Sequence, residues 1–195
     1  MVNQPSVYSY PQIIDAAFDL LREEGWGAVS TRAIAKRLGS STMPIYSHVR
    51  SVAELEQELR RKARALLRDY QARQYTGDVL LNLAFGYIVF ARDEKHLFRF
   101  LYLDRPEEIR HERGSGMKEA FLKEFGNDSS AAAALAEMQD SGHETLIQYT
   151  WIFTHGLAML VNSGTIKSPS DQYIMGLLRD AGEAFYTWGT RGTED

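Results

Sequence analysis

The chain of 195 residues has no cysteine, and this absence excludes disulfides, thiolate metal sites and thiol nucleophiles. It also lacks a hydrophobic run that could span a bilayer, because the longest one, residues 80–91, is short and contains Asn82. The start of the chain shows no basic segment followed by an apolar one, so we expect no signal peptide. With hydrophobic residues at 44%, the sequence predicts a cytoplasmic protein with a proper core and no contact with a membrane.

The common catalytic and cofactor motifs are also missing. The sequence has no HExxH pair, no phosphate-cradling glycine loop and no Gly-x-Ser-x-Gly turn. The adjacent pairs His111-Glu112 and His143-Glu144 would point apart on a helix, so neither is a metal pair. We therefore expect no enzyme activity, no cofactor and no metal.

Basic residues are few overall but gathered in one segment. The net charge is −4, which argues against a protein that coats nucleic acid along its whole surface. Residues 30–75 nevertheless hold ten Lys/Arg against four Asp/Glu. A local basic segment of this kind is typical of a protein that binds nucleic acid at one place.

Residues 9–24 carry the pattern of a first helix. Ser9 and Gln12 form a capping box, and Gly25 is expected to lie just beyond the end of the helix. Its apolar residues recur at helical spacing on one face and are Ile13, Ile14, Ala17, Phe18 and Leu21.

The next segment has the spacing of a helix-turn-helix. Ser30 is a good N-cap for a helix over residues 31–38, and Gly39 follows its end, where a left-handed backbone conformation is cheap only for glycine. Ala35 is small enough for another helix to approach closely. Ile45, six residues after Gly39, completes the skeleton of the motif.

The third helix, predicted over residues 41–48, presents a polar face. Ile45 can point inward, which leaves the hydroxyl and aromatic side chains outward. Such a face offers hydroxyls for phosphates, an apolar group for thymine in Met43, and Tyr46 and His48 for backbone oxygens. Each of these side chains alone is more often merely solvated, but the run as a whole favours a DNA contact.

Residues 9–60 resemble the DNA-binding domain of the TetR family of bacterial repressors. The resemblance rests on Ile13-Ile14-x-x-Ala17, Gly25, Ser30-Thr31-x-x-Ile34-Ala35, Leu38-Gly39, Ile45-Tyr46-x-His48 and Leu55. It implies an all-α homodimer with an N-terminal three-helix domain that binds a palindromic double-stranded DNA operator, and a C-terminal helical domain for ligand binding and dimerisation. The implied DNA contacts, with exposed Ser41 added, are Thr31, Arg32, Ser41, Thr42, Met43, Tyr46, Ser47 and His48. At the start of the fourth helix, where the family often has lysine, this chain has Val52.

A long helix follows, from a second capping box at Ser51 and Glu54 to about residue 74. Most of its basic residues are expected to form a solvated face, and the set is Arg60, Arg61, Lys62, Arg64 and Arg68. Further helices are predicted over residues 78–91, 94–103, 106–125, 130–138, 144–162 and 168–188. The expected division is a DNA-binding domain at 9–50, a connecting helix at 51–75, and an effector-binding and dimerisation domain at 76–190.

The helix predicted over residues 144–162 contains Trp151, His155 and Gly156, which resemble the Trp-His-Gly signature of one TetR subgroup. Trp151 and His155 lie four residues apart and share a helix face. His155 is either a hydrogen-bonded core histidine or a group that points into an effector cavity. The expected contacts of a flat or apolar effector, which are equally compatible with plain core, are Phe85, Phe98, Tyr102, Phe121, Trp151 and His155.

The last two predicted helices carry apolar stripes that a single domain would leave partly exposed. A four-helix bundle made from two copies would cover them. The residues expected at this interface are Leu157, Leu160, Val161, Ile174, Leu177, Leu178, Ala181 and Phe185. Reading a palindrome also requires a pair, because two recognition helices must lie roughly 34–36 Å apart, about one duplex turn.

These patterns predict a transcriptional repressor that a small-molecule effector releases from its operator. Two other interpretations stay open. One is a helix-turn-helix protein that acts through protein partners or binds DNA without sequence preference, and the other is an all-helical enzyme.

Overall fold

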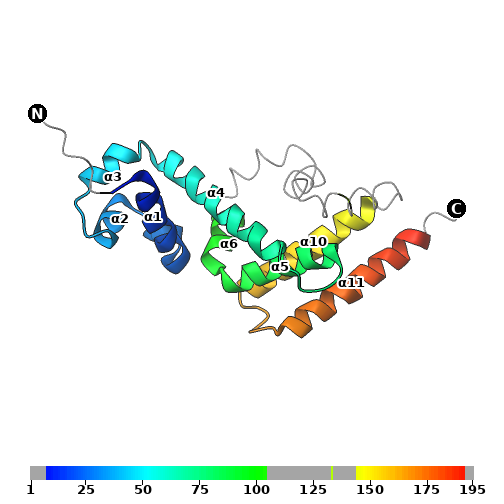
Figure 1. Cartoon of the computed structure of the whole chain (residues 1–195). Coiled ribbons are helices and arrows are strands. Elements are labelled where there is room, and N and C mark those ends of the chain that lie inside the picture. Colours follow the sequence, from blue (N-terminus) through cyan, green and yellow to red (C-terminus); the bar gives the residue numbers. More distant parts are fainter. Residues whose placement is uncertain (1–7, 105–132, 134–143, 192–195) are drawn as a thin grey trace, which may run out of the picture. The chain divides into compact units, whose positions relative to one another are not determined.

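The computed structural model describes residues 8–104, 133 and 144–191, and every regular element among them is helical (Figure 1). The predicted all-α class is therefore confirmed. The helices predicted over residues 106–125 and 130–138 lie outside the described residues, apart from Ala133. The elements are α1 (Tyr10–Glu24), η1 (Trp26–Ala28), α2 (Thr31–Arg37), α3 (Met43–His48), α4 (Val52–Gln71), α5 (Val79–Asp93), α6 (Lys95–Tyr102), α10 (Glu144–Asn162) and α11 (Asp171–Arg191).

The chain divides into two compact units. The head unit contains residues 1–66 and 94–105, and the body unit contains residues 67–93 and 106–195. Helix α6 groups with the head, although it follows α5 of the body directly in sequence. These units describe compactness, and the functional division expected from the sequence stays a prediction.

Local sequence signals set the bounds of the head helices. Before α1, the side chain of Gln12 accepts a hydrogen bond from the Ser9 backbone N–H at 2.8 Å, as the predicted capping box requires. Helix α3 begins at Met43, two residues later than predicted. The cause is Pro44, which has no backbone N–H to donate and is favoured in the first turn of a helix.

The head packs around aliphatic side chains that are almost completely buried. Helix α1 contacts both α2 and α6, and α2 contacts α3. Burying a side chain of this size stabilises a fold by about 1.5–3 kcal/mol relative to leaving it in water. The fully buried members include Ile13, Leu21, Ile34, Leu59 and Leu97.

Helix α6 is fastened to the rest of the head by polar and aromatic contacts. Both carboxylate oxygens of buried Glu94 accept hydrogen bonds from Arg22, one of them from Nε at 2.6 Å. The Trp26 and Phe100 rings lie 5.1 Å apart. Arg60 of α4 donates to the Phe100 carbonyl oxygen at 3.1 Å, and its guanidinium lies 4.6 Å from the centre of the Phe100 ring. Arg60, whose side chain is only 14% exposed, is therefore an exception to the solvated face expected for most basic residues of this helix.

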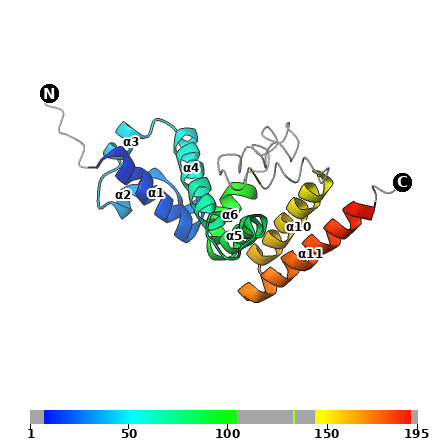
Figure 2. The ribbon, with the colours of Figure 1, turned by 45° about the vertical axis from the view of Figure 1, so that its right-hand side comes forward.

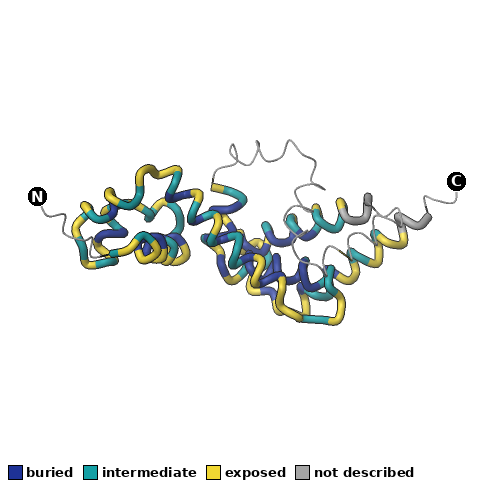
Figure 3. Tube along the Cα trace, turned by 45° about the horizontal axis from the view of Figure 1, so that its top comes forward, coloured by how far each residue is buried: buried dark blue, intermediate teal, exposed yellow. Residues whose placement is uncertain are grey.

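In the body unit, α10 and α11 pack against α5 and against each other (Figure 2). Helix α5 is buried on nearly all sides between residues 82 and 91, as its hydrophobic sequence predicts (Figure 3). Gly86 allows the end of α4 to cross α5 closely. A Cβ atom at this position would lie 2.7 Å from the Gln71 Cα, and nearer still to the carbonyl oxygen of Tyr70.

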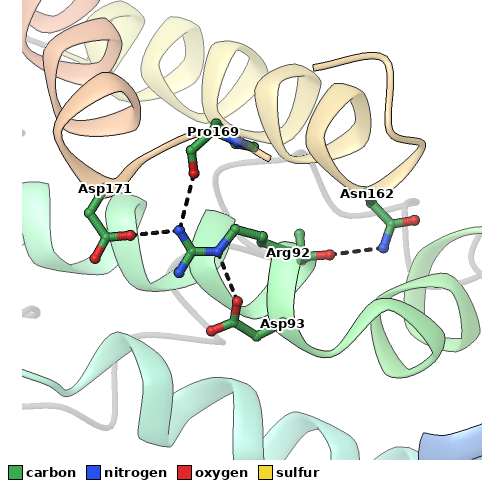
Figure 4. Close-up of polar contacts among 6 residues, drawn as sticks. Arg92, Asp93, Asn162, Pro169 and Asp171 are labelled. Atoms are coloured by element: carbon green, nitrogen blue, oxygen red, sulfur yellow. Dashed lines mark hydrogen bonds and ion pairs between the residues drawn. The ribbon is translucent and has the colours of Figure 1, made fainter. Parts of the chain in front are cut away.

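Polar contacts hold the last turn of α5 against the segment between α10 and α11 (Figure 4). Asn162 donates to the Ala91 carbonyl oxygen at 2.9 Å. The Arg92 guanidinium donates to Asp93 at 2.8 Å, to Asp171 at 2.6 Å and to the Pro169 carbonyl at 3.4 Å. The hydrogen bonds to Asp93 and Asp171 raise the pKa of the Arg92 side chain above its ordinary value.

Candidate functional site

Helices α2 and α3 form a rigid frame around one tight turn. Gly39 has a φ of +62°, as predicted for a glycine beyond the end of α2. The Gly39 N–H donates to the Lys36 carbonyl at 3.1 Å and the Ser40 N–H donates to the Ala35 carbonyl at 2.9 Å, so the last carbonyls of α2 are satisfied. Ala35 and Ile45 are 3% and 2% exposed, which anchors α3 from beneath.

The remaining side chains of α3 face outward. Met43 is 75% exposed and Tyr46 is 66% exposed. Ser47 is exposed as well, and its hydroxyl donates to the Pro44 carbonyl at 2.8 Å. His48 is half-buried at the end of the helix. Of the other expected DNA contacts, Arg32 and Ser41 are exposed, and Thr31 and Thr42 are half-buried.

Some basic side chains around this frame form ion pairs with described residues, and others do not. Arg37 donates two hydrogen bonds to Glu23, at 2.6 and 2.8 Å, and these bonds lower the pKa of the Glu23 carboxyl. Arg32, Lys36 and Arg50 are exposed and form no ion pair with any described residue. Cations of this kind can neutralise DNA phosphates without first breaking an ion pair.

The side chains of Ser51 and Glu54 cap the start of α4. The Ser51 hydroxyl oxygen accepts from the Glu54 N–H at 3.1 Å, and the Glu54 carboxylate accepts from the Arg50 N–H at 3.0 Å. Val52 is 64% exposed. An apolar side chain therefore projects into solvent where the resemblance would place a lysine.

A short helix with an exposed face, packed through buried residues against the preceding helix across a glycine turn, is the arrangement of a helix-turn-helix. Residues 13–59 match the family model described as bacterial regulatory proteins, tetR family. Residues 13–59 are a DNA-binding domain of the TetR family. The TetR match covers most of α1, all of α2 and α3, and the first part of α4, and supports a transcriptional regulator that binds DNA through this helix-turn-helix.

The fold of the chain is similar to that of a solved protein. A crystal structure of a transcriptional regulator from Rhodococcus sp. Rha1 matches it with a TM-score of 0.61 and 17% sequence identity. The match covers 92% of this chain and 97% of the other. At this identity the likeness shows a shared fold. No curated protein matches the chain in sequence.

In the body unit, two of the expected effector residues lie together. The Trp151 and His155 rings stack with centroids 5.3 Å apart and planes 2° from parallel. His155 Nδ1 is 2.8 Å from the hydroxyl of Tyr87, a residue that the sequence did not single out. Tyr87 lies 68 positions earlier in the chain, on buried α5. Nothing in the hydrophobic sequence around Tyr87 indicates that its hydroxyl would bind a histidine.

The other expected effector residues occupy separate places. Phe85 is 2% exposed in the body unit, where its ring lies edge-on to Tyr75 at 4.7 Å. Phe98 is fully buried in the head unit, 5.0 Å from the Tyr102 ring. Phe121 lies outside the described residues.

The expected dimer residues fall into two groups. Leu157, Val161, Ile174 and Leu178 are 5% exposed or less within a single chain. Within one chain they pack in the core between α10, α11 and α5, and their assignment to an interface stays a prediction. Leu160 is 44% exposed, and Leu177, Ala181 and Phe185 are half-buried.

Two further searches concern the described residues only. No group of three His, Asp or Glu side chains among them is placed to hold a metal ion. None of the described helices has both the length and the apolar character needed to cross a membrane.

Proposed function

We propose that this TetR-family regulator is a repressor, that it binds a palindromic operator as a homodimer, and that a small effector releases it. The exposed face of α3, held on a buried frame and flanked by exposed cations, is the observation that carries the proposal. Such a regulator would act in the cytoplasm, without a cofactor and without a catalytic step.

The contacts expected from the sequence, with exposed Arg50 added, are proposed in two groups. Phosphate contacts would come from the cations Arg32 and Arg50, and from side chains that hydrogen-bond to phosphate oxygens. Base contacts would come from the centre of the exposed face, at Met43 and Ser47. The phosphate-binding hydrogen-bond donors proposed are Thr31, Ser41, Thr42, Tyr46 and His48.

Dimerisation is proposed on the outer face of α10. Ile152, Gly156 and Leu160 follow one another at intervals of four residues and are all exposed, Ile152 at 46% and Leu160 at 44%. No atom lies within 4 Å of the place that a Gly156 Cβ would occupy, so another backbone could approach closely there. Tyr173 of α11, 50% exposed, would extend this apolar surface.

Effector binding is proposed beside the Trp151–His155 pair. An imidazole that is hydrogen-bonded to a tyrosine and stacked on an indole offers a polar group next to a flat apolar surface. This combination suits a ligand with a flat apolar body and one polar group. The ligand would release the operator only if it binds the released state more tightly than the DNA-bound state.

The test begins with selection of duplexes from a random pool by the full-length protein. Dissociation constants are then measured for the selected and for random duplexes at several salt concentrations. The proposal predicts a palindromic sequence bound about a thousandfold or more tightly than random DNA, with two chains on each duplex. Equal affinity for all duplexes would favour the alternative of binding without sequence preference.

The effector is tested on the same complex. A panel of flat apolar compounds, each with one carbonyl or carboxylate group, is titrated into the protein bound to the selected duplex. At least one compound should weaken binding in the parent and have less effect in His155→Ala. A panel that leaves operator affinity unchanged would contradict effector release by this class of ligand.

A further inference from the structure

The exposed large apolar side chains of the head lie close together in the sequence. Among the described residues of the head they are Met43 at 75%, Tyr46 at 66% and Val52 at 64%, and we name these three the apolar patch. They come from α3 and from the first position of α4. A large exposed apolar side chain costs solubility, so such a grouping indicates a contact surface.

The charge of the surrounding segment indicates what covers the apolar patch. Residues 30–75 hold ten Lys/Arg against four Asp/Glu. Exposed Arg32, Lys36 and Arg50 form no ion pair with the described residues. A basic surround favours a polyanion, and we commit to duplex DNA as the occupant.

Helix α3 carries no lysine or arginine in its sequence MPIYSH. No side chain of α3 can therefore form the two parallel hydrogen bonds by which arginine recognises guanine. The hydroxyl proton of Ser47 is directed to the Pro44 carbonyl. Met43 and Tyr46 are three positions apart and lie on one side of the helix.

The major groove of DNA exposes one kind of apolar group that the Met43 and Tyr46 side chains could contact. This group is the C5-methyl of thymine, whereas the other base edges present hydrogen-bond donors and acceptors. A thioether placed against those polar edges would leave them without partners, which is unfavourable. Contact with a thymine methyl removes apolar surface from water on both sides.

We infer that Met43 is a specificity-determining residue that reads thymine methyl groups, so that each half-site of the operator has a T·A pair where α3 enters the groove. The inference rests on the proposed function and adds the kind of sequence that the regulator reads. The Tyr46 ring and Val52 border the same contact.

The experiment uses the duplex selected by the full-length protein. Each thymine of one half-site is replaced in turn by deoxyuridine, which removes only the methyl group. At the contacted position the parent should lose about fourfold in affinity for each methyl removed. A thymine outside both half-sites serves as the control and should have no effect.

Two variants show whether Met43 is responsible. Met43→Ala should bind the thymine and uracil duplexes equally at that position, whereas Met43→Leu should keep most of the discrimination. Because Met43 is 75% exposed, both variants should retain the helical circular dichroism of the parent.

The outcomes separate the inference from the function on which it rests. If no duplex is selected, DNA recognition itself fails, and the apolar patch is then a surface for another partner. If a duplex is selected but its binding is indifferent to uracil at every position, or its half-sites contain no T·A pair, the inference is overturned and the regulator remains. Uracil sensitivity that persists unchanged in Met43→Ala would also overturn it.

Discussion

Replacing Gly86 by alanine is predicted to destabilise the body unit, although alanine is the better helix former. In the middle of a free helix the exchange would stabilise by about 1 kcal/mol. Here the new Cβ would lie 2.7 Å from the Gln71 Cα and 2.8 Å from the Tyr70 carbonyl carbon. Because both are backbone atoms, α4 and α5 must move apart, and overpacking of this kind costs about 1–3 kcal/mol or more. The net loss should be about 1–2 kcal/mol.

Gly182→Ala provides the matched control in the same unit. Gly182 lies inside α11, and no atom is within 4 Å of its would-be Cβ, so this variant should gain up to about 1 kcal/mol. For a chain of this length the two variants should melt about 5–10 °C apart. Thermal unfolding is followed by circular dichroism at equal protein concentration, because dimerisation would make the midpoint depend on concentration. Equal midpoints for the two variants would refute the close crossing at Gly86.

Two further predictions concern binding and assembly. Arg50→Gln should lower the slope of log affinity against log salt by about 1.8 for the dimer on its operator, because each of the two chains loses one phosphate contact, while the preferred sequence stays the same. Arg179→Gln, at an exposed position of α11, should leave that slope unaltered. An unaltered slope for Arg50→Gln would show that Arg50 does not contact a phosphate. Leu160→Asp should convert the dimer to a monomer in sedimentation, whereas the equally exposed change Gln57→Asp should not. A Leu160→Asp protein that still sediments as a dimer would exclude the α10 face.

The head could be predicted from local sequence because local chemistry defines it. The spacing of Ala35, Gly39 and Ile45 predicted the turn, and the positive φ of Gly39 together with two buried neighbours confirms it. The start of α3 was predicted two residues early, because the preference of Pro44 for the first turn of a helix was not considered. The outward polar face of α3 was also predicted, because Ile45 was expected to be the side chain that points inward.

Contacts between distant segments could not be predicted in this way. Arg60 meets Phe100 across 40 positions and Tyr87 meets His155 across 68, and no local pattern records either contact. The sequence also could not distinguish dimer residues from core residues. Apolar residues recur at the same helical spacing whether they face the core of their own chain or a second copy, so only the exposure of Leu157 and Leu160 in the fold distinguishes the two.

The central claim is that α3 reads DNA, and the affinity of Tyr46→Ala for the selected operator tests it most directly. Tyr46 is 66% exposed, so its replacement should leave the fold and the dimer intact. A lost hydrogen bond to a phosphate corresponds to about tenfold to a hundredfold weaker binding. Tyr46→Phe, which keeps the ring, should show most of the same loss if the hydroxyl makes the contact. The account predicts a dimeric Tyr46→Ala protein with at least tenfold weaker operator binding, and parental affinity in that variant would contradict it.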